Sequence, residues 1–168
     1  MPYNANLEPE SCSKNPKDVD CPNTAYWVED SLGTAPGSDA NKSTFILGHA
    51  WGEDFRVFNT MSNRALDGLD FAQVKKDKGC GVSPRAVYDI TTLNDDVAMV
   101  STEKGSLSYV VYKAFAVCKD NIAKIPSIWQ PIPNRLVLIA CATSADGLDY
   151  DYNIVVYAQL ESSSPTKN

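Results

Sequence analysis

The chain lacks internal repeats, long apolar runs and an excess of positive charge. No run of 18 or more apolar residues occurs among its 168 residues, so no membrane-spanning helix is predicted. Lysine and arginine together number 15 against 21 acidic residues, which gives a formal net charge of -6. Nucleic acids and anionic membranes bind basic protein faces, so neither is expected as a partner.

Histidine is also scarce: His49 is the one histidine in the sequence, and no Cys-x2-Cys spacing occurs. Zinc sites are built from closely spaced cysteine and histidine ligands, so we expect no metal site and no cofactor. What is present is typical of a globular protein, with 43% apolar and 21% charged residues. A chain of this length forms one domain with a core of its own.

The beginning of the chain, up to Ser11, is polar and lacks the apolar core of a signal peptide. The sequence therefore leaves two contexts open, a cytosolic protein or a trimmed extracellular domain that starts at an added methionine. Residues 1–25 carry four prolines among many polar residues and are predicted to form an N-terminal arm. Residues 26–160 are predicted to form the body, and residues 161–168 a disordered tail.

The body alternates short apolar segments with turn signals, which is typical of a mainly β protein. Strands are predicted at Thr44–Leu47, Phe55–Phe58, Ala86–Thr91, Val97–Ser101, Leu107–Cys118, Arg135–Cys141 and Asn153–Leu160. Residues 61–80 are predicted to hold one or two short helices, and residues 119–134, with three prolines, a loop. Strict alternation over 107–118 would place Tyr109, Val111, Lys113 and Phe115 on one face. About seven short strands with little helix predict a closed or nearly closed β-barrel.

Five cysteines make an odd number, so at least one thiol stays unpaired if two intramolecular disulfides form. They are Cys12, Cys21, Cys80, Cys118 and Cys141. The first two lie nine residues apart in the polar arm, where little else would hold the chain in place. Pairing of Cys12 with Cys21 and of Cys80 with Cys118 is one of several schemes that the spacing allows, and buried reduced thiols are the alternative.

Two reactive side chains end two of the most apolar segments. His49 follows Phe-Ile-Leu-Gly, and Cys141 follows Leu-Val-Leu-Ile-Ala. Taken singly, a lone histidine or a thiol beside a core strand is more often structural than catalytic. Together they supply the minimum for a thiol nucleophile, because an imidazolium lowers the thiol pKa and the thiolate attacks a carbonyl carbon. They are 92 residues apart in the sequence, so only the fold can bring them together.

The surroundings of these residues resemble those of the sortases, a family of cysteine transpeptidases. Residues 43–58, STFILGHAWGEDFRVF, resemble the sortase strand that ends in Gly-His, with a Val-Phe strand after a loop. Residues 134–160, NRLVLIACATSADGLDYDYNIVVYAQL, resemble the Leu-x-Leu-x-Thr-Cys strand, its loop and the final x-Val-Val-x-Ala strand. Between them, Leu93–Val97 and Tyr109–Val111 resemble the family's Leu-x-x-Gly-Asp-x-Val turn and Tyr-x-Val strand. The resemblance covers about residues 25–160 in order.

The resemblance implies an eight-stranded closed β-barrel with short helices in its connections. It implies an enzyme on the extracellular face of the membrane, mainly in Gram-positive bacteria, that cleaves a Leu-Pro-x-Thr-Gly-like sorting signal on a secreted protein. An amine acceptor, on a cell-wall precursor or a pilin, would then receive the cleaved protein. Cys141 would be the nucleophile and His49 the general acid. We expect the domain itself to be a monomer. Its final strand resembles that of the actinobacterial-type classes of sortase.

The sequence departs from the family at two places. The family carries a catalytic arginine on the last strand, where this chain has Asn153, and no arginine follows Cys141. An amide can also donate to an oxyanion, so Asn153 is the predicted replacement. Tyr150 or Tyr152 could donate as well, and Arg135 is a further candidate, but six strand residues separate it from Cys141 by about 20 Å. Ala140 stands where the family has threonine before the cysteine.

Four residues are predicted to contact the substrate: Ala140, Trp51, Trp129 and Tyr152. Trp51 follows His49 closely, and Trp129 lies in the loop that the family uses for recognition. Because the arginine is missing, a catalytically inactive sortase-fold module for binding or structure is the main alternative. An L,D-transpeptidase is disfavoured, since that family has a Gly-Cys with a nearby histidine late in the chain.

Overall fold

The computed structural model describes residues 25–28, 33–50, 56–76, 80, 87–143 and 149–165, and the fold is mainly β. The seven strands are β1 (Ala25–Trp27), β2 (Thr44–Gly48), β3 (Val87–Ile90), β4 (Val97–Thr102), β5 (Gly105–Cys118), β6 (Arg135–Thr143) and β7 (Asp149–Pro165). The helices are α2 (Asn59–Asp67), α3 (Phe71–Lys76), the 3-10 helix η4 (Lys119–Lys124) and α4 (Pro126–Trp129). None of the helices in these ranges is long and apolar enough to cross a membrane.

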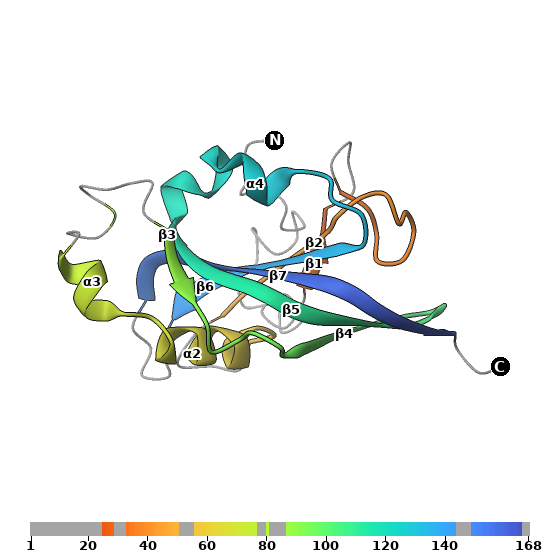
Figure 1. Cartoon of the computed structure of the whole chain (residues 1–168), viewed down its shortest axis with the longest axis horizontal. Helices are drawn as coiled ribbons and strands as arrows, with labels where there is room; N and C mark the ends of the chain where they lie inside the picture. Colours follow the sequence, from red (N-terminus) through yellow and green to blue (C-terminus); the bar gives the residue numbers. More distant parts are fainter. Residues whose placement is uncertain are drawn as a thin grey trace, which may run out of the picture.

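All seven strands belong to one sheet with the order β1-β2-β6-β7-β5-β3, and β4 pairs with the other part of β5 (Figure 1). The pairing of β2 with β6 is parallel, and the other strand pairs are antiparallel. No pairing within the described ranges joins β1 to β3 or β4, so the sheet is open there. The predicted mainly β fold is confirmed, whereas the closed barrel and its eighth strand are not.

The central strands bury side chains on both faces, and helices cover each face. Leu136, Leu138, Ile154 and Val156 point to one face, where they pack with Ala65 and Leu66 of α2. We call this the α2 face. Val137, Ile139, Val155 and Tyr157 point to the other, the α4 face, and pack with Ile128 and Trp129 of α4. Figure 1 shows α4 on one side of the strands and α2 on the other.

The predicted single face of β5 is wrong, because the strand carries a β-bulge. Pairing with β7 shifts register between Val111 and Lys113. Tyr109 and Val111 consequently pack on the α2 face, whereas Phe115 packs on the α4 face. An extra residue in a strand reverses the alternation beyond it. Tyr112 at the bulge is half-exposed.

Three further segments differ from the sequence prediction. Residues 56–58, expected as part of a strand, lead into α2 through a turn in which the Asn59 N–H donates to the Arg56 carbonyl at 3.1 Å. The expected loop at 119–134 contains η4 and α4. Residues 161–165, expected in a disordered tail, continue β7, since Ser162–Pro165 pair with the beginning of β5.

The far end of β5 is tied by a disulfide between Cys80 and Cys118. This is one of the pairings that the sequence left open. Cys141 keeps its thiol. Cys12 and Cys21 lie outside the described residues, so their pairing stays a prediction.

Candidate active site

The parallel pairing of β2 with β6 sets the level of His49 relative to Cys141. Thr44 pairs with Leu136, and each of the following pairs keeps the same offset of 92 residues up to Leu47 with Ile139. His49 lies two residues beyond the last pair and Cys141 also lies two residues beyond it. The strands of a sheet are about 4.8 Å apart, so His49, one residue past the end of β2, is expected near Cys141 in β6.

Asn153 lies on the other side of Cys141. The two residues are directly opposite each other in the antiparallel pairing of β6 with β7. Side chains of such a pair stand on the same face, with Cβ atoms about 4.5–5.5 Å apart. Alternation from Val137 and Ile139 places Cys141 on the α4 face, and alternation from Val155 and Tyr157 places Asn153 there as well. Asn153 is buried, whereas Cys141 is partly exposed.

His49 is also partly exposed, and it follows a strand whose Phe45 and Leu47 pack on the α4 face. Cys141 of β6 and Asn153 of β7 are paired, and His49 lies one residue past the end of β2, on the other side of β6. The set combines an imidazole, a thiol and an amide. Such a set can supply a proton, a nucleophile and a hydrogen-bond donor to a carbonyl group that lies across β6.

A serine that the sequence analysis did not single out lies beneath the thiol. The side chain of Ser62 in α2 is fully buried. Its Oγ lies 2.9 Å from the Cys141 carbonyl oxygen and 3.1 Å from that of Thr143, and it accepts from the Thr143 N–H at 3.0 Å. One sequence signal points to it: Ser62 precedes the core residues Ala65 and Leu66 by three and four positions, which puts it on the apolar stripe of the helix.

Of the other predicted substrate contacts, Ala140 and Tyr152 lie on the α2 face and not beside the thiol. Ala140 falls between Leu138 and Ala142 in the alternation of β6 and is 2% exposed. Tyr152 is 5% exposed and packs edge-on against Tyr88 at 5.8 Å between ring centroids. The structure therefore does not bring these two side chains to the face that carries Cys141.

Trp129 does lie on the α4 face, but it is almost entirely buried. Its ring packs against Phe45 at 5.6 Å, and its Nε1 donates to the carbonyl oxygen of Ile122 at 3.0 Å. Its side chain joins α4 to η4 and β2, with 8% of its surface exposed. Trp51 lies outside the described residues, so its role stays a prediction.

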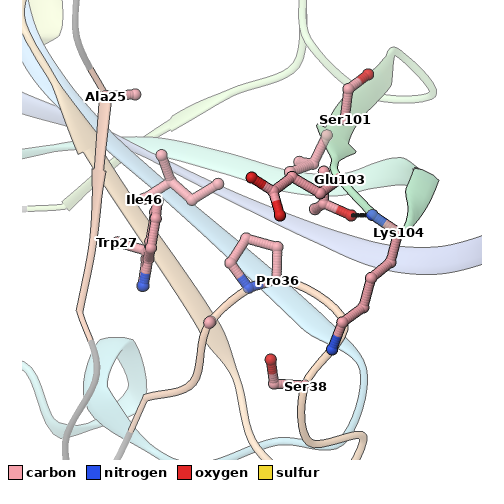
Figure 2. A pocket seen from close by; sticks show the side chains of 11 residues that line it. Ala25, Trp27, Pro36, Ser38, Ile46, Ser101, Glu103 and Lys104 are labelled. Atoms are coloured by element: carbon pink, nitrogen blue, oxygen red, sulfur yellow. Dashed lines mark hydrogen bonds between the residues drawn. The ribbon is translucent and has the colours of Figure 1, made fainter.

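A cavity of about 670 Å³ opens elsewhere on the molecule, between β1 and the hairpin of β4 and β5. Figure 2 shows Trp27 and Ile46 on one side of it, Pro36 in the middle, and Glu103 and Lys104 on the other side. Ile46 belongs to the α2 face. None of His49, Cys141 and Asn153 lines this cavity, so it is separate from the candidate active site.

Comparison with known proteins identifies the fold. No family model matches the sequence, and no curated protein does. Among solved structures, sortase C of Streptococcus pneumoniae superposes with a TM-score of 0.52 at 15% identity, over 84% of this chain and 55% of that one. Sortase C2 of pilus island 1 from Group B Streptococcus gives 0.50 at 12% identity, over 83% of this chain and 59% of that one. The chain has the sortase fold.

The sortase fold confirms the family resemblance seen in the sequence motifs, and the identity of 12–15% carries it no further than the fold. The chain spans slightly more than half the length of the sortase C structures that it matches. Sortase E1 of Streptomyces coelicolor, solved with a tripeptide in its active site, is also similar, with a TM-score of 0.49 at 14% identity over 88% of this chain and 75% of that one.

Arg135 lies too far from Cys141 to take the place of the sortase arginine. Arg135 begins β6, at the other end of the strand from Cys141, and is 1% exposed. Its guanidinium donates to Ser43 Oγ and to the carbonyl oxygens of Ser127 and Ile128. Burial lowers the pKa of Arg135, and the neighbouring tyrosines act in the opposite direction. This arginine holds α4 to β6 and does not lie beside the thiol.

Proposed function

We propose that this chain is a cysteine transpeptidase. It cleaves a Leu-Pro-x-Thr-Gly-like sorting signal through a thioacyl intermediate and transfers the protein to an amine acceptor on the cell wall or a pilin. The proposal places the enzyme at the extracellular face of the membrane. The observation that supports it is the pairing of Cys141 with Asn153, together with the parallel register of β2 and β6, in which His49 and Cys141 each lie two residues beyond the pair of Leu47 with Ile139.

The chemistry assigned to the site runs in two halves. The Cys141 thiolate attacks the threonine carbonyl carbon, and the tetrahedral oxyanion collapses as the peptide C–N bond breaks. The leaving amine takes a proton from the His49 imidazolium, and the acyl group stays on Sγ as a thioester. In the second half the acceptor amine attacks the thioester, gives its proton to neutral His49 and expels the thiolate. The new amide bond is the product.

Asn153 is assigned to the oxyanion. Its amide N–H donates as a neutral dipole from the position directly across β6–β7 from the thiol. Such a donor in a water-poor site contributes about 2–4 kcal/mol to transition-state stabilisation. An arginine would supply charge in addition, so the chain is expected to turn over more slowly than an enzyme with a cation there.

The test is incubation of wild type and Cys141→Ala with a library of Leu-Pro-x-Thr-Gly-like peptides, followed by intact-mass measurement. Wild type should gain the mass of an acyl group, and hydroxylamine added as acceptor should remove it as a hydroxamate. Cys141→Ala should gain nothing. Asn153→Ala should acylate about 100- to 1000-fold more slowly, and Asn153→Gln should recover part of the rate.

The second candidate function is an inactive sortase-fold module for binding or structure, which the asparagine in place of arginine favours. It predicts no adduct with any peptide and a Cys141 alkylation rate equal to that of an ordinary thiol. The alkylation rate of wild type against His49→Ala separates the two functions without a known substrate. A transpeptidase loses rate when His49 is removed, and an inactive module does not.

A further inference from the structure

The first turn of α2 is hydrogen-bonded to the backbones of both proposed catalytic residues. The Phe58 N–H donates to the His49 carbonyl at 3.1 Å, and the Ser62 N–H donates to the Phe58 carbonyl at 2.9 Å. The Ser62 hydroxyl then contacts the Cys141 carbonyl at 2.9 Å. These bonds form a continuous chain from β2 through α2 to β6.

Both strands lose regular sheet pairing where this chain attaches. β2 ends at Gly48, one residue before His49. The β6–β7 pairing becomes irregular directly after the pair of Cys141 with Asn153. The next pair is Thr143 with Asp149, so a step of two residues along β6 matches a step of four residues back along β7. Backbone polar groups in a protein interior need partners, and at these strand ends the sheet does not supply them in its regular pattern.

Ser62 supplies partners on the β6 side of this gap. With one proton its hydroxyl donates to the Cys141 or the Thr143 carbonyl at a time, and its lone pair accepts from the Thr143 N–H at 3.0 Å. Thr143 is 3% exposed and Ser62 is fully buried, so water does not reach these groups from the described surface. Removal of the hydroxyl would leave buried backbone groups without their partner.

Gly48 allows the other end of the chain to form. A Cβ on Gly48 would lie 2.7 Å from the Phe58 ring and 2.8 Å from Val57 Cγ1. Real Cβ atoms do not approach so closely, so any larger residue would push Phe58 away from β2. Such a displacement would strain the bond between the Phe58 N–H and the His49 carbonyl.

We propose that Ser62 is a positioning residue: with Phe58 it uses the first turn of α2 to fix the backbone of Cys141 relative to that of His49. The inference rests on the proposed function, because it assigns Ser62 to the alignment of the thiol with the imidazole. Ser62 does not touch the reacting atoms. It acts through the carbonyl of the nucleophile, at the point where the sheet stops holding β6 in register.

The test measures the alkylation of Cys141 by iodoacetamide as a function of pH, followed at its own peptide by mass spectrometry so that other cysteines do not contribute. Ser62→Ala should lower the alkylation rate of Cys141 near neutral pH by about fivefold. This factor corresponds to the free energy of one hydrogen bond of ordinary strength. Its pH profile should shift toward that of His49→Ala. Ser62→Cys, of nearly the same shape and with a weaker donor, should lie between wild type and Ser62→Ala.

Ala65→Gly is the matched control. It lies on the same helix, is fully buried and makes no hydrogen bond to β6 through its side chain, and it should lower stability by about as much as a lost hydrogen bond. Its pH profile should stay that of wild type. If Ser62→Ala and Ala65→Gly have the same profile as wild type while both lose stability, Ser62 is a structural residue only and the inference is overturned.

Two further variants keep the outcome decisive. If Ser62→Ala does not fold, Gly48→Ala tests the other end of the chain and should also shift the profile toward that of His49→Ala. An unshifted profile in folded Gly48→Ala contradicts the inference. A His49→Ala profile identical to wild type rejects the thiol–imidazole pair itself, and therefore the proposed function, independently of how Ser62→Ala behaves.

Discussion

Arg135→Met should lower the free energy of unfolding and leave the alkylation rate of the Cys141 thiol nearly unchanged. The guanidinium donates to Ser43 Oγ at 3.1 Å and to the carbonyl oxygens of Ser127 at 2.9 Å and Ile128 at 2.8 Å. A further bond goes to the Gln130 carbonyl. Each acceptor left unpaired in the interior costs about 1–3 kcal/mol.

Loss of the buried charge offsets part of that cost, because the guanidinium no longer has to be desolvated in the folded state. The ring of Tyr157, over which the guanidinium carbon lies at 4.8 Å, keeps its apolar contact with methionine. The net loss expected for Arg135→Met is therefore about 3–5 kcal/mol. Arg135→Lys, which keeps the charge but reaches fewer carbonyls, should lose roughly half as much.

The assay is urea unfolding followed by tryptophan fluorescence. With a slope of about 2 kcal/mol per molar urea, Arg135→Met should lower the midpoint by about 2 M. Iodoacetamide alkylation of Cys141 should change less than about twofold, because the thiol lies about 20 Å away along β6. A wild-type urea midpoint combined with a tenfold or greater loss of alkylation rate would refute this reasoning and return Arg135 to the list of catalytic candidates.

Three further predictions concern stability. The double change Cys80→Ala with Cys118→Ala should cost about 4 kcal/mol in urea unfolding, since the disulfide closes a loop with a sequence separation of 38. Burial raises the pKa of Tyr109 above 10.0, so the unfolded chain releases this proton at a lower pH than the folded protein does. The free energy of unfolding should therefore fall as the pH rises past 10.0. The fall should be less steep in Tyr109→Phe than in wild type or in the control Tyr112→Phe. Gly105 has a φ of 145°, which L-residues rarely adopt, so Gly105→Ala should lower the melting temperature with a loss of about 1–3 kcal/mol.

Each of these predictions has a result that contradicts it. An unchanged urea midpoint after loss of the disulfide would mean that Cys118 is held by its strand pairing alone. Equal alkaline slopes for wild type and Tyr109→Phe would place the proton release on other groups. Ser106→Ala is the neighbouring control for Gly105→Ala, and equal melting temperatures for these two variants would show that the glycine conformation is dispensable.

The strand pattern was accessible from the sequence because local apolar runs report burial directly, whereas the roles of His49, Cys141 and Asn153 stay predictions. Arg135–Cys141 was predicted as a strand, and β6 extends it by two residues to Thr143. The 92-residue separation of His49 and Cys141 was visible but had no meaning until the parallel register was known. Position opposite the thiol adds to the case for Asn153, whose role stays a prediction.

Other features depend on pairing between distant segments, which no local pattern reports. The serines at Ser162–Ser164 have a weak preference for strands, yet they continue β7 because the first residues of β5 offer their backbone groups. The bulge near Tyr112 reversed a face that strict alternation had predicted. Helical spacing puts Ser62 on the apolar stripe of α2, but no local pattern reports its partners, which are backbone atoms about eighty positions later in the chain.

The place of β6 in the sheet also has a consequence for biogenesis. β6 lies between β2 and β7, and its parallel partner β2 precedes it by about ninety residues. Contacts of such long sequence separation form late and slowly during folding, because the intervening chain must be ordered first. In a partly synthesised or partly folded chain, the imidazole of His49 and the thiol of Cys141 are apart. If the two residues act together as proposed, a reactive thiolate would form only after β6 has inserted, which would protect the cysteine from premature oxidation and unwanted acylation while the protein matures.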